Sequence, residues 1–275
     1  MDALHTKIII SQPRNSWKQL RLKKVWQYRS LILAFVTRDI KSQYAQTRLG
    51  IAWSFIQAIT AALVINLFFG VLIRIDTGEV PYILYAFPGM MAWYYFSYII
   101  NQSGTSLVQS QHIIKKIYFP KLILPIYKTT VGLVEHLIWL VVFFALMLLY
   151  GFPVGLNLVV LPFFIFLNII AGLSVALWLS ALTVRYRDAT HIIPFLIGFG
   201  VFVTPVFYKT AMIPAAYSYL IYFNPMAGVI AGYRWCLLGT PPEIQYLYGL
   251  IPVIVLLVSG LYYFRRIEGI MADVI

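Results

Sequence analysis

Apolar and polar positions alternate along this chain in long blocks, and the apolar blocks are too long for the helices of an ordinary soluble core. The first block, Ile51–Ile73, contains no charged residue. A helix that crosses the hydrocarbon core of a bilayer needs roughly 20 apolar residues, because each residue advances it by about 1.5 Å. The block therefore predicts a membrane-spanning helix.

Further apolar blocks of the same kind follow along the chain. They are Tyr82–Ile100, Thr129–Tyr150, Leu156–Val184, Ile192–Phe207 and Leu247–Phe264. The fold class predicted by this pattern is an all-α membrane protein with six transmembrane helices. The block at 192–207 is shorter and contains Pro194, Gly198, Gly200 and Pro205, so we expect a bent or broken helix there.

The segment that precedes the first span is cationic and amphipathic. On a helix, one flank would hold Arg38, Lys41 and Arg48. The opposite flank would hold Tyr28, Ile32, Val36, Ile40 and Tyr44, interrupted at its edge by Asp39 and Gln43. Such a helix lies in the membrane surface with its apolar side in the acyl boundary. Residues 1–50 are thus expected to be a cytoplasmic and interfacial segment, and 51–275 a six-helix transmembrane domain.

The stretch 208–246, between the fifth and sixth predicted spans, is semi-apolar and contains four prolines. It is too polar and broken to span, yet too apolar for a free loop. We expect a pair of short re-entrant helices that dip into the membrane from the external face. Irregular backbone at that depth must be covered by protein or face water, which indicates a nearby pathway or gate.

Composition and charge support a membrane protein and fix its orientation. Hydrophobic residues make up 61% of the 275 residues and charged residues 11%, against about 45–50% and 25% in soluble domains. The net charge of +12 does not indicate nucleic-acid binding, because the cations lie between apolar runs. Eighteen of the 21 Lys and Arg residues fall on one side if both termini are cytoplasmic.

Catalytic and metal-binding patterns are missing from the sequence. There is no phosphate-binding loop, no nucleophile–base pair and no cluster with metal-ligand spacing, and the single Cys236 excludes a CxxC site. Glu135 and His136 form the one ionisable pair deep in a span. They point about 100° apart on a helix and are interpreted as a functional acid or as interhelical hydrogen-bond partners. Arg185, Arg187 and Asp188, near His191, are expected to form an ion-pair network in a loop.

Polar and small residues within the spans give the candidate pathway. Trp53, Gln57 and Thr60 lie within about 60° of one another on the first span. Thr204, Phe207 and Tyr208 lie near the outer end of the fifth span, where aromatic faces could anchor in the interface or stack on sugar rings. A small-residue row, Gly172, Ala176 and Ser180, predicts a close helix crossing on the fourth span.

The loop 102–125 is expected to be cytoplasmic and to contain a short amphipathic helix. Its candidate contact residues are Gln111, Ile113, Ile114, Lys115, Lys116, Ile117 and Tyr118. An apolar knob flanked by lysines can dock into a groove of a cytosolic partner or rest on the inner leaflet, and the sequence does not separate the two.

Several motifs together resemble the transmembrane subunit of bacterial type-2 ABC exporters, and among them the exporters of O-antigen, capsular polysaccharide and teichoic acid. They are RDIKSQYAQTRLGIAW at Arg38, KKIYFPKLILP at Lys115, RYRDATHIIPFLIGFG at Arg185, TPVFY at Thr204 and YFNPM at Tyr222. The resemblance covers nearly the whole chain after residue 30.

The resemblance implies a multi-pass subunit of the bacterial cytoplasmic membrane that acts as a homodimer with two copies of a cytosolic ABC ATPase. ATP and Mg²⁺ would then bind in that partner, with no cofactor in this chain. Ser106–Phe119 would be the coupling helix, and the re-entrant pair would map to Ala211–Tyr233. The first and fifth helices would line the channel through Trp53, Gln57, Thr60, Thr204 and Tyr208.

The expected function is export of a lipid-linked polysaccharide, driven by ATP hydrolysis in the partner. Arg38, Lys41 and Arg48 would meet the pyrophosphate of the lipid carrier, or else serve only as positive-inside anchors. The alternatives are an exporter of a small drug or lipid, a proton-coupled secondary transporter that uses Glu135 and His136, and a membrane-embedded transferase. The function of residues 1–25 stays open.

Overall fold

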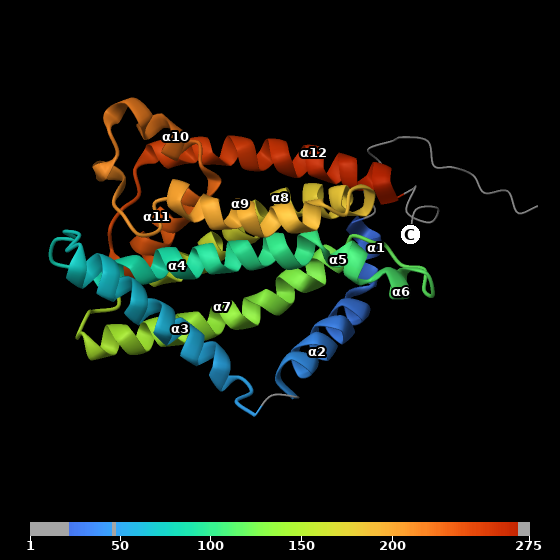
Figure 1. Cartoon of the computed structure of the whole chain (residues 1–275), viewed down its shortest axis with the longest axis horizontal. Coiled ribbons are helices and arrows are strands. Elements are labelled where there is room, and N and C mark those ends of the chain that lie inside the picture. The colour runs from blue at the N-terminus through green and yellow to red at the C-terminus, as the bar shows by residue number, and fades with distance from the viewer. Residues whose placement is uncertain (1–21, 46–47, 269–275) are drawn as a thin grey trace, which may run out of the picture.

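A computed structural model describes residues 22–45 and 48–268, and every regular element in these two ranges is a helix (Figure 1). The N-terminal part of the predicted cytoplasmic segment, residues 46–47 of the cationic junction, and 269–275 lie outside the described residues. In Figure 1 the long helices run roughly side by side, while the short helices α5 (Ser106–Gln109) and α6 (Gln111–Ile114) lie at one end.

Four helical stretches are long and apolar enough to cross a membrane: Ala52–Leu72, Ile123–Leu149, Leu156–Arg185 and Ile244–Glu268. They match the first, third, fourth and sixth predicted spans. The first consists of α3 (Ala52–Ile65) and the π-helical η2 (Asn66–Leu72), and the second is α7 (Ile123–Leu149). The others are the 3₁₀ turn η4 (Leu156–Val160) with α8 (Leu161–Arg185), and η7 (Ile244–Gly249) with α12 (Leu250–Glu268).

The second and fifth predicted spans are present as shorter helices. The second is α4 (Tyr82–Tyr98), which continues through Pro88 into the π-helical η3 (Ile99–Ser103). The fifth is α9 (Ala189–Val203), and it runs through Pro194 without a break. The predicted break lies after Val203 rather than at Pro194. The chain leaves this helix at Thr204, with ψ of 139°, because a residue before proline is disfavoured in the helical region and Pro205 follows.

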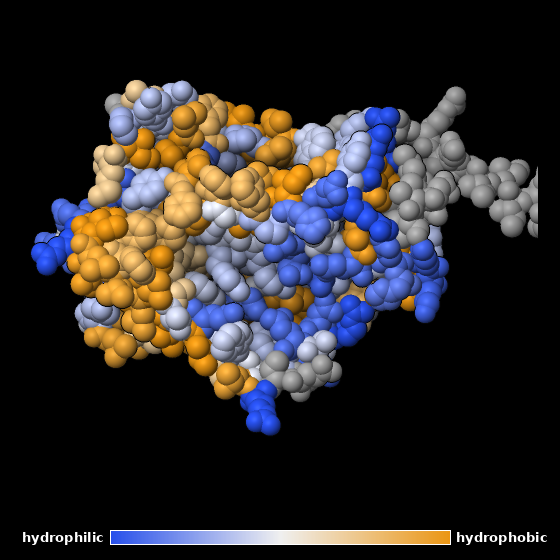
Figure 2. Space-filling view, in the orientation of Figure 1, coloured by the Kyte–Doolittle hydropathy of each residue, from blue (hydrophilic) through white to orange (hydrophobic). Residues whose placement is uncertain are grey.

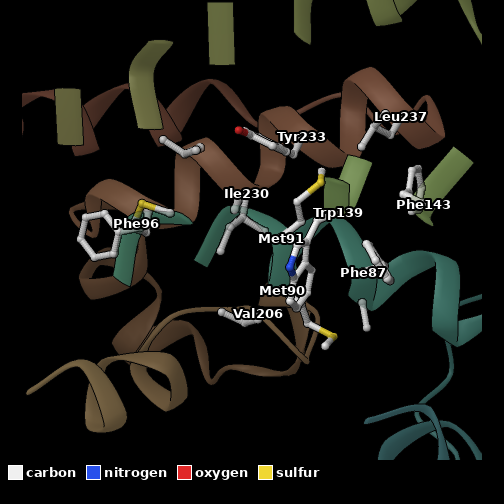
Figure 3. Packing of buried hydrophobic residues seen from close by; sticks show 14 of the residues in the cluster. Phe87, Met90, Met91, Phe96, Trp139, Phe143, Val206, Ile230, Tyr233 and Leu237 are labelled. Atoms are coloured by element: carbon white, nitrogen blue, oxygen red, sulfur yellow. The ribbon is translucent and has the colours of Figure 1, made fainter. Parts of the chain in front are cut away.

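The core of the molecule surrounds α4, which is buried along most of its length against α7, α8 and α11 (Pro225–Leu238). Figure 3 shows Phe87 and Met91 of α4 among side chains from α7 and α11, with Trp139 and Tyr233 close by. Helices in a membrane associate through van der Waals packing and close approach at small residues. Because α4 lies at the centre of the molecule, this helix of 17 residues exposes little apolar surface.

The predicted small-residue row on α8 does form a close crossing. Ala176 and Ser180 are fully buried. A Cβ atom at Gly172 would lie 2.8 Å from Cγ2 of Ile99, so only glycine leaves room for that side chain. The row therefore lets α8 pack directly against the π-helical turn η3.

The stretch 208–246 contains one short and one longer α-helix. They are α10 (Ser218–Tyr222) and α11, preceded by the 3₁₀ turns η5 (Thr210–Met212) and η6 (Ala215–Tyr217). Two helices are found where a re-entrant pair was predicted, and the longer one, α11, is buried against α4 and α8. It ends at Gly239, whose φ of 79° is a left-handed conformation that suits glycine.

The amphipathic segment is helical, as α1 (Leu22–Gln27) and α2 (Arg29–Ala45), but its apolar row faces protein. Val36 and Phe35 are each 8% exposed. The Phe35 ring lies 6.1 Å from that of Phe119 and 5.2 Å from that of Tyr127. The prediction that this row lies in the acyl boundary is corrected for Val36, and Tyr28, Ile32 and Ile40 of the same row are half-buried against the same cluster of side chains.

Candidate functional site

A polar cleft with a volume of about 540 Å³ opens between α2, α3, α4, α7 and α9. In Figure 2 a pale to blue band runs between orange surface over α9 and over α3. One wall comes from the end of α4 and from η3, where polar side chains recur three and four residues apart on one face. They are Tyr94, Ser97, Tyr98, Asn101 and Gln102.

The other walls of the cleft come from four different helices. Gln43 of α2, Gln57 of α3 and Glu135 of α7 contribute polar side chains. On the α9 side the lining consists of Pro194, Ile197 and Gly198. The lining is thus polar on α2, α3, α7 and the α4–η3 helix, and apolar on α9.

Glu135 is the one acid in this lining, and its two oxygens are both acceptors. Nε2 of Gln43 donates to Oε1, and the hydroxyl of Tyr94 donates to Oε2 at 3.2 Å. The side chain is 7% exposed. These contacts join α2, α4 and α7 at the cleft, as expected for an interhelical hydrogen-bond partner.

His136 points away from the cleft, into the core. Its Nε2 lies 3.1 Å from the hydroxyl of Tyr233, and its ring stacks on Tyr95 with 4.8 Å between centroids. The ring is 1% exposed. Glu135 and His136 therefore take part in two separate networks, and no direct relay joins them in this arrangement.

The predicted channel residues of α3 differ in position. Gln57 lines the cleft. Trp53, 51% exposed, and Thr60, also exposed, lie on the same flank of α3 but outside the cleft lining. Of the three, Gln57 is the residue that the structure brings to the site.

The predicted residues beyond α9 do not line the cleft. Thr204 is 1% exposed, and its Oγ1 accepts a hydrogen bond from Nδ2 of Asn224 at 2.9 Å. The ring of Phe207 stacks on Phe69 with 5.5 Å between centroids. The hydroxyl of Tyr208 donates to the carbonyl of Phe202 at 3.0 Å. These contacts are structural, so the channel-lining interpretation is corrected for Thr204, whose hydroxyl is already satisfied inside the protein.

The predicted entrance cations lie on or just after α2. Arg38 is ion-paired to Asp39 at 2.8 Å, and Asp39 also accepts from Lys128 of α7 at 3.0 Å. Burial by itself raises the pKa of Asp39, but the hydrogen bonds from the two cations outweigh it and leave the pKa below its usual value. Lys41 and Arg48 are exposed. Asp39 thus ties α2 to α7 through Lys128, while Arg38 pairs with it within α2.

The predicted coupling helix is divided into α5 and α6, separated by Ser110. Lys115 and Lys116 are exposed, as are Ile117 at 53% and Tyr118 at 85%. By contrast, the half-buried members of the predicted contact set are Gln111, Ile113 and Ile114. The exposed knob is therefore 115–118, and the two isoleucines of α6 are half-buried against the protein, so their contact with a partner stays a prediction.

The predicted ion-pair network at the end of α8 is absent from the part of the chain that the structure describes. The salt bridges among the described residues lie elsewhere and join Arg38 to Asp39, Lys128 to Asp39, and Arg265 to Glu268. Arg185, Arg187 and Asp188 are exposed. The guanidinium of Arg185 instead lies over the ring of Tyr186, 5.4 Å from its centroid.

Residues 30–238 match the family model described as ABC-2 type transporter. The chain belongs to this family. The matched range contains every residue that lines the cleft, from Gln43 on α2 to Gly198 on α9. The family assignment therefore applies to the part of the chain that forms the site.

Curated relatives of this family member cover most of its length. It is 26% identical over 215 residues to the "O-antigen export system permease protein RfbA" of Myxococcus xanthus. The aligned residues cover 78% of this chain and 82% of the relative. It is 25% identical over 248 residues to the protein of the same name from Klebsiella pneumoniae, which covers 89% and 95% of the two chains.

Sequence reasoning missed most of the polar wall of the cleft. The signal was present, because Tyr94, Ser97, Tyr98 and Asn101 are spaced as i, i+3, i+4 and i+7, which places them on one helix face. Gln43 was noted only as an interruption of the apolar row on α2. Its partner Glu135 lies 92 residues away in the chain.

Proposed function

We propose that this chain is the transmembrane subunit of an ABC transporter that exports a lipid-linked polysaccharide across the bacterial cytoplasmic membrane. Membership of the ABC-2 family and the O-antigen export permeases among the relatives support this proposal. The observation that carries it is the cleft, whose wall of tyrosines, amides and one carboxylate is suited to hydroxyl-rich chains. A pocket for apolar drugs would instead be lined predominantly by hydrophobic side chains.

The proposed active form is a homodimer of six-span subunits with both termini cytoplasmic. Apolar side chains on the cleft side are exposed on both α3 and α9, for example Val64 at 44% and Phe202 at 67%. A second copy of the chain would cover such faces and turn two open clefts into one lumen. Polar side chains of both copies would then face each other across the path.

Coupling to ATP hydrolysis is proposed to run through the exposed knob 115–118. Phe119, next to this knob, is 1% exposed and contacts Phe35 of α2. A push by a cytosolic ATPase on the knob would therefore be transmitted to α2 and α7. Both helices contribute side chains to the cleft, Gln43 and Glu135, so the stroke reaches the path directly.

Lipid-carrier binding is proposed for the cationic surface of α2. Lys41 and Arg48 are exposed, and Arg38 is half-exposed beside Asp39. Cations placed near the cytoplasmic mouth can hold the pyrophosphate of the carrier, because charge-assisted hydrogen bonds to phosphate are strong. The sugar chain would then enter the cleft while its anchor stays at the membrane surface.

Export from vesicles tests the proposal. Vesicles that contain the subunit with its candidate ATPase should move a lipid-linked glycan across the bilayer only when ATP is supplied. Omission of the ATPase, or replacement of residues 115–118 by a Gly-Ser linker of equal length, should abolish this export. Export that persists without the ATPase would contradict the proposal and favour a secondary transporter.

A further inference from the structure

We infer that Glu135 makes the cleft selective for uncharged glycans and against polymers that carry repeated negative charge. This inference rests on the proposed function and deepens it by naming the class of polymer. It starts from the charge of the lining. Besides the carboxyl group of Glu135, the lining side chains are amides, hydroxyls and apolar groups, and no Lys, Arg or His is among them.

The charged groups beside Glu135 on α2 and α7 lie outside the lining. Asp39 lies one helical turn before Gln43, and Lys128 lies two turns before Glu135. The two are paired to each other at 3.0 Å. Arg38 pairs with the same Asp39 and Lys41 is exposed, but none of these four groups lines the cleft, so Glu135 is the one charged side chain in its lining.

Both carboxyl oxygens of Glu135 accept hydrogen bonds. An amide N–H of Gln43 and the hydroxyl of Tyr94 donate to its two different oxygens. An ionised carboxylate only accepts, and its two oxygens offer about four acceptor sites. Acceptor positions therefore remain for hydroxyl groups of a sugar, which donate readily.

A single negative charge in such a place acts over the whole width of the path. Low-dielectric walls that carry charge of one sign focus the field into a cleft. In the proposed dimer two copies of Glu135 would contribute to one lumen. A neutral sugar chain meets hydrogen-bond acceptors there, whereas each acidic unit of a charged polymer is repelled as it passes.

The test uses vesicles that contain the full-length subunit with its ATPase, and two matched probes. One probe is a neutral lipid-linked glycan, and the other is the same glycan with part of its primary hydroxyls oxidised to carboxylates. The wild-type protein should export the neutral probe faster by roughly tenfold, as expected for one like-charge contact near a protein surface. High salt should reduce the difference, because it screens the charge.

Two substitutions in the cleft separate charge from structure. Glu135→Gln should export both probes at similar rates. Asn101→Asp adds a carboxylate at an exposed position of the same lining while Glu135 stays in place. This variant should discriminate more strongly against the acidic probe. The control Glu243→Gln removes a carboxylate that bonds to Tyr222 outside the cleft, and it should leave the discrimination unchanged.

Equal export of both probes by the wild-type protein would overturn the inference. The inference would also fail if Glu135→Gln still discriminated fully between the probes and Asn101→Asp had no effect. These outcomes leave the proposed function intact, because the neutral probe is still exported. ATP-independent movement, or no export of either probe, would instead overturn the proposed function itself.

Discussion

Asn224 holds two segments of the chain with one side chain. Its Oδ1 accepts a hydrogen bond from the backbone N–H of Met226 at 2.9 Å and thus caps the N-terminus of α11, where Pro225 occupies the first turn. Its Nδ2 donates to Oγ1 of Thr204 at 2.9 Å. The start of α11 is thereby fixed to the point where the chain leaves α9.

Replacement of Asn224 by alanine should lower the free energy of unfolding by about 1–2 kcal/mol, because a helix loses its cap and a buried hydroxyl loses its partner. Thermal unfolding of the purified subunit in detergent measures this change. Thr204→Val removes only the link between the two segments and should cost less. Equal stability of Asn224→Ala and the wild-type protein would show that the cap contributes nothing.

At the scale of single residues, the sequence allowed prediction of side chains whose position follows from their own helix. Gln57 is polar within an apolar span, and it does line the cleft. Thr204 had the same signal but is buried against Asn224, a contact across 20 residues that no helical periodicity reports. The partners of Glu135 were hidden for the same reason, since α2 and α4 supply them.

At the scale of helices, the small-residue row of α8 shows how sequence spacing sets packing. Gly172 faces Ile99 of η3 so closely that a Cβ atom would lie 2.8 Å from Cγ2 and 3.0 Å from Cδ1 of that side chain. Contacts of this kind let backbones approach in the absence of a hydrophobic driving force between helices. The crossing between α8 and η3 therefore depends on the missing side chain.

Gly172→Ala should destabilise the subunit by about 1–3 kcal/mol, because overpacking forces Ile99 or the helix to shift. Gly198→Ala is the matched control, since its Cβ atom would meet no atom within 4 Å and α9 would gain the better helix former. Thermal unfolding in detergent compares the two variants. A larger loss of stability in Gly198→Ala than in Gly172→Ala would contradict this account of the crossing.

The lengths of the helices could be predicted from the apolar runs in the sequence. What packs against each helix could not. Four spans were placed closely, although α7 begins at Ile123 rather than Thr129. The pattern on α2 gave the correct apolar face but not what covers it, because Val36 is buried by protein and not by lipid. The π-helical turns η2 and η3 had no sequence signal, since their hydrogen-bond shift depends on packing against neighbours.

At the scale of the whole molecule, the loop 102–125 changes from an exposed residue to a buried one between two neighbouring positions. Tyr118 is 85% exposed and Phe119 is 1% exposed. Phe119 also carries the ammonium of Lys121 over its ring, 4.7 Å from the centroid. The loop thus offers an exposed contact to a partner and a buried anchor to the helices.

Tyr118→Ala should weaken binding of the ATPase by roughly tenfold and leave the stability of the subunit unchanged, because an exposed aromatic residue can act as an anchor in an interface. Phe119→Ala should instead destabilise the subunit by about 3 kcal/mol through a cavity in the core. Pull-down of the ATPase and thermal unfolding, applied to both variants, distinguish the two roles. Loss of stability in Tyr118→Ala would contradict the exposed position of this residue.

The cleft as the path of the polymer is the central claim, and polymer export by Gln57→Trp tests it most directly. The larger side chain should block the cleft and abolish ATP-dependent export in vesicles, while the subunit still assembles with its ATPase. Ile59→Trp is the control, because Ile59 is exposed on the opposite side of α3 and should tolerate the change. Undiminished export by Gln57→Trp, with the protein correctly assembled, would show that the polymer takes another route.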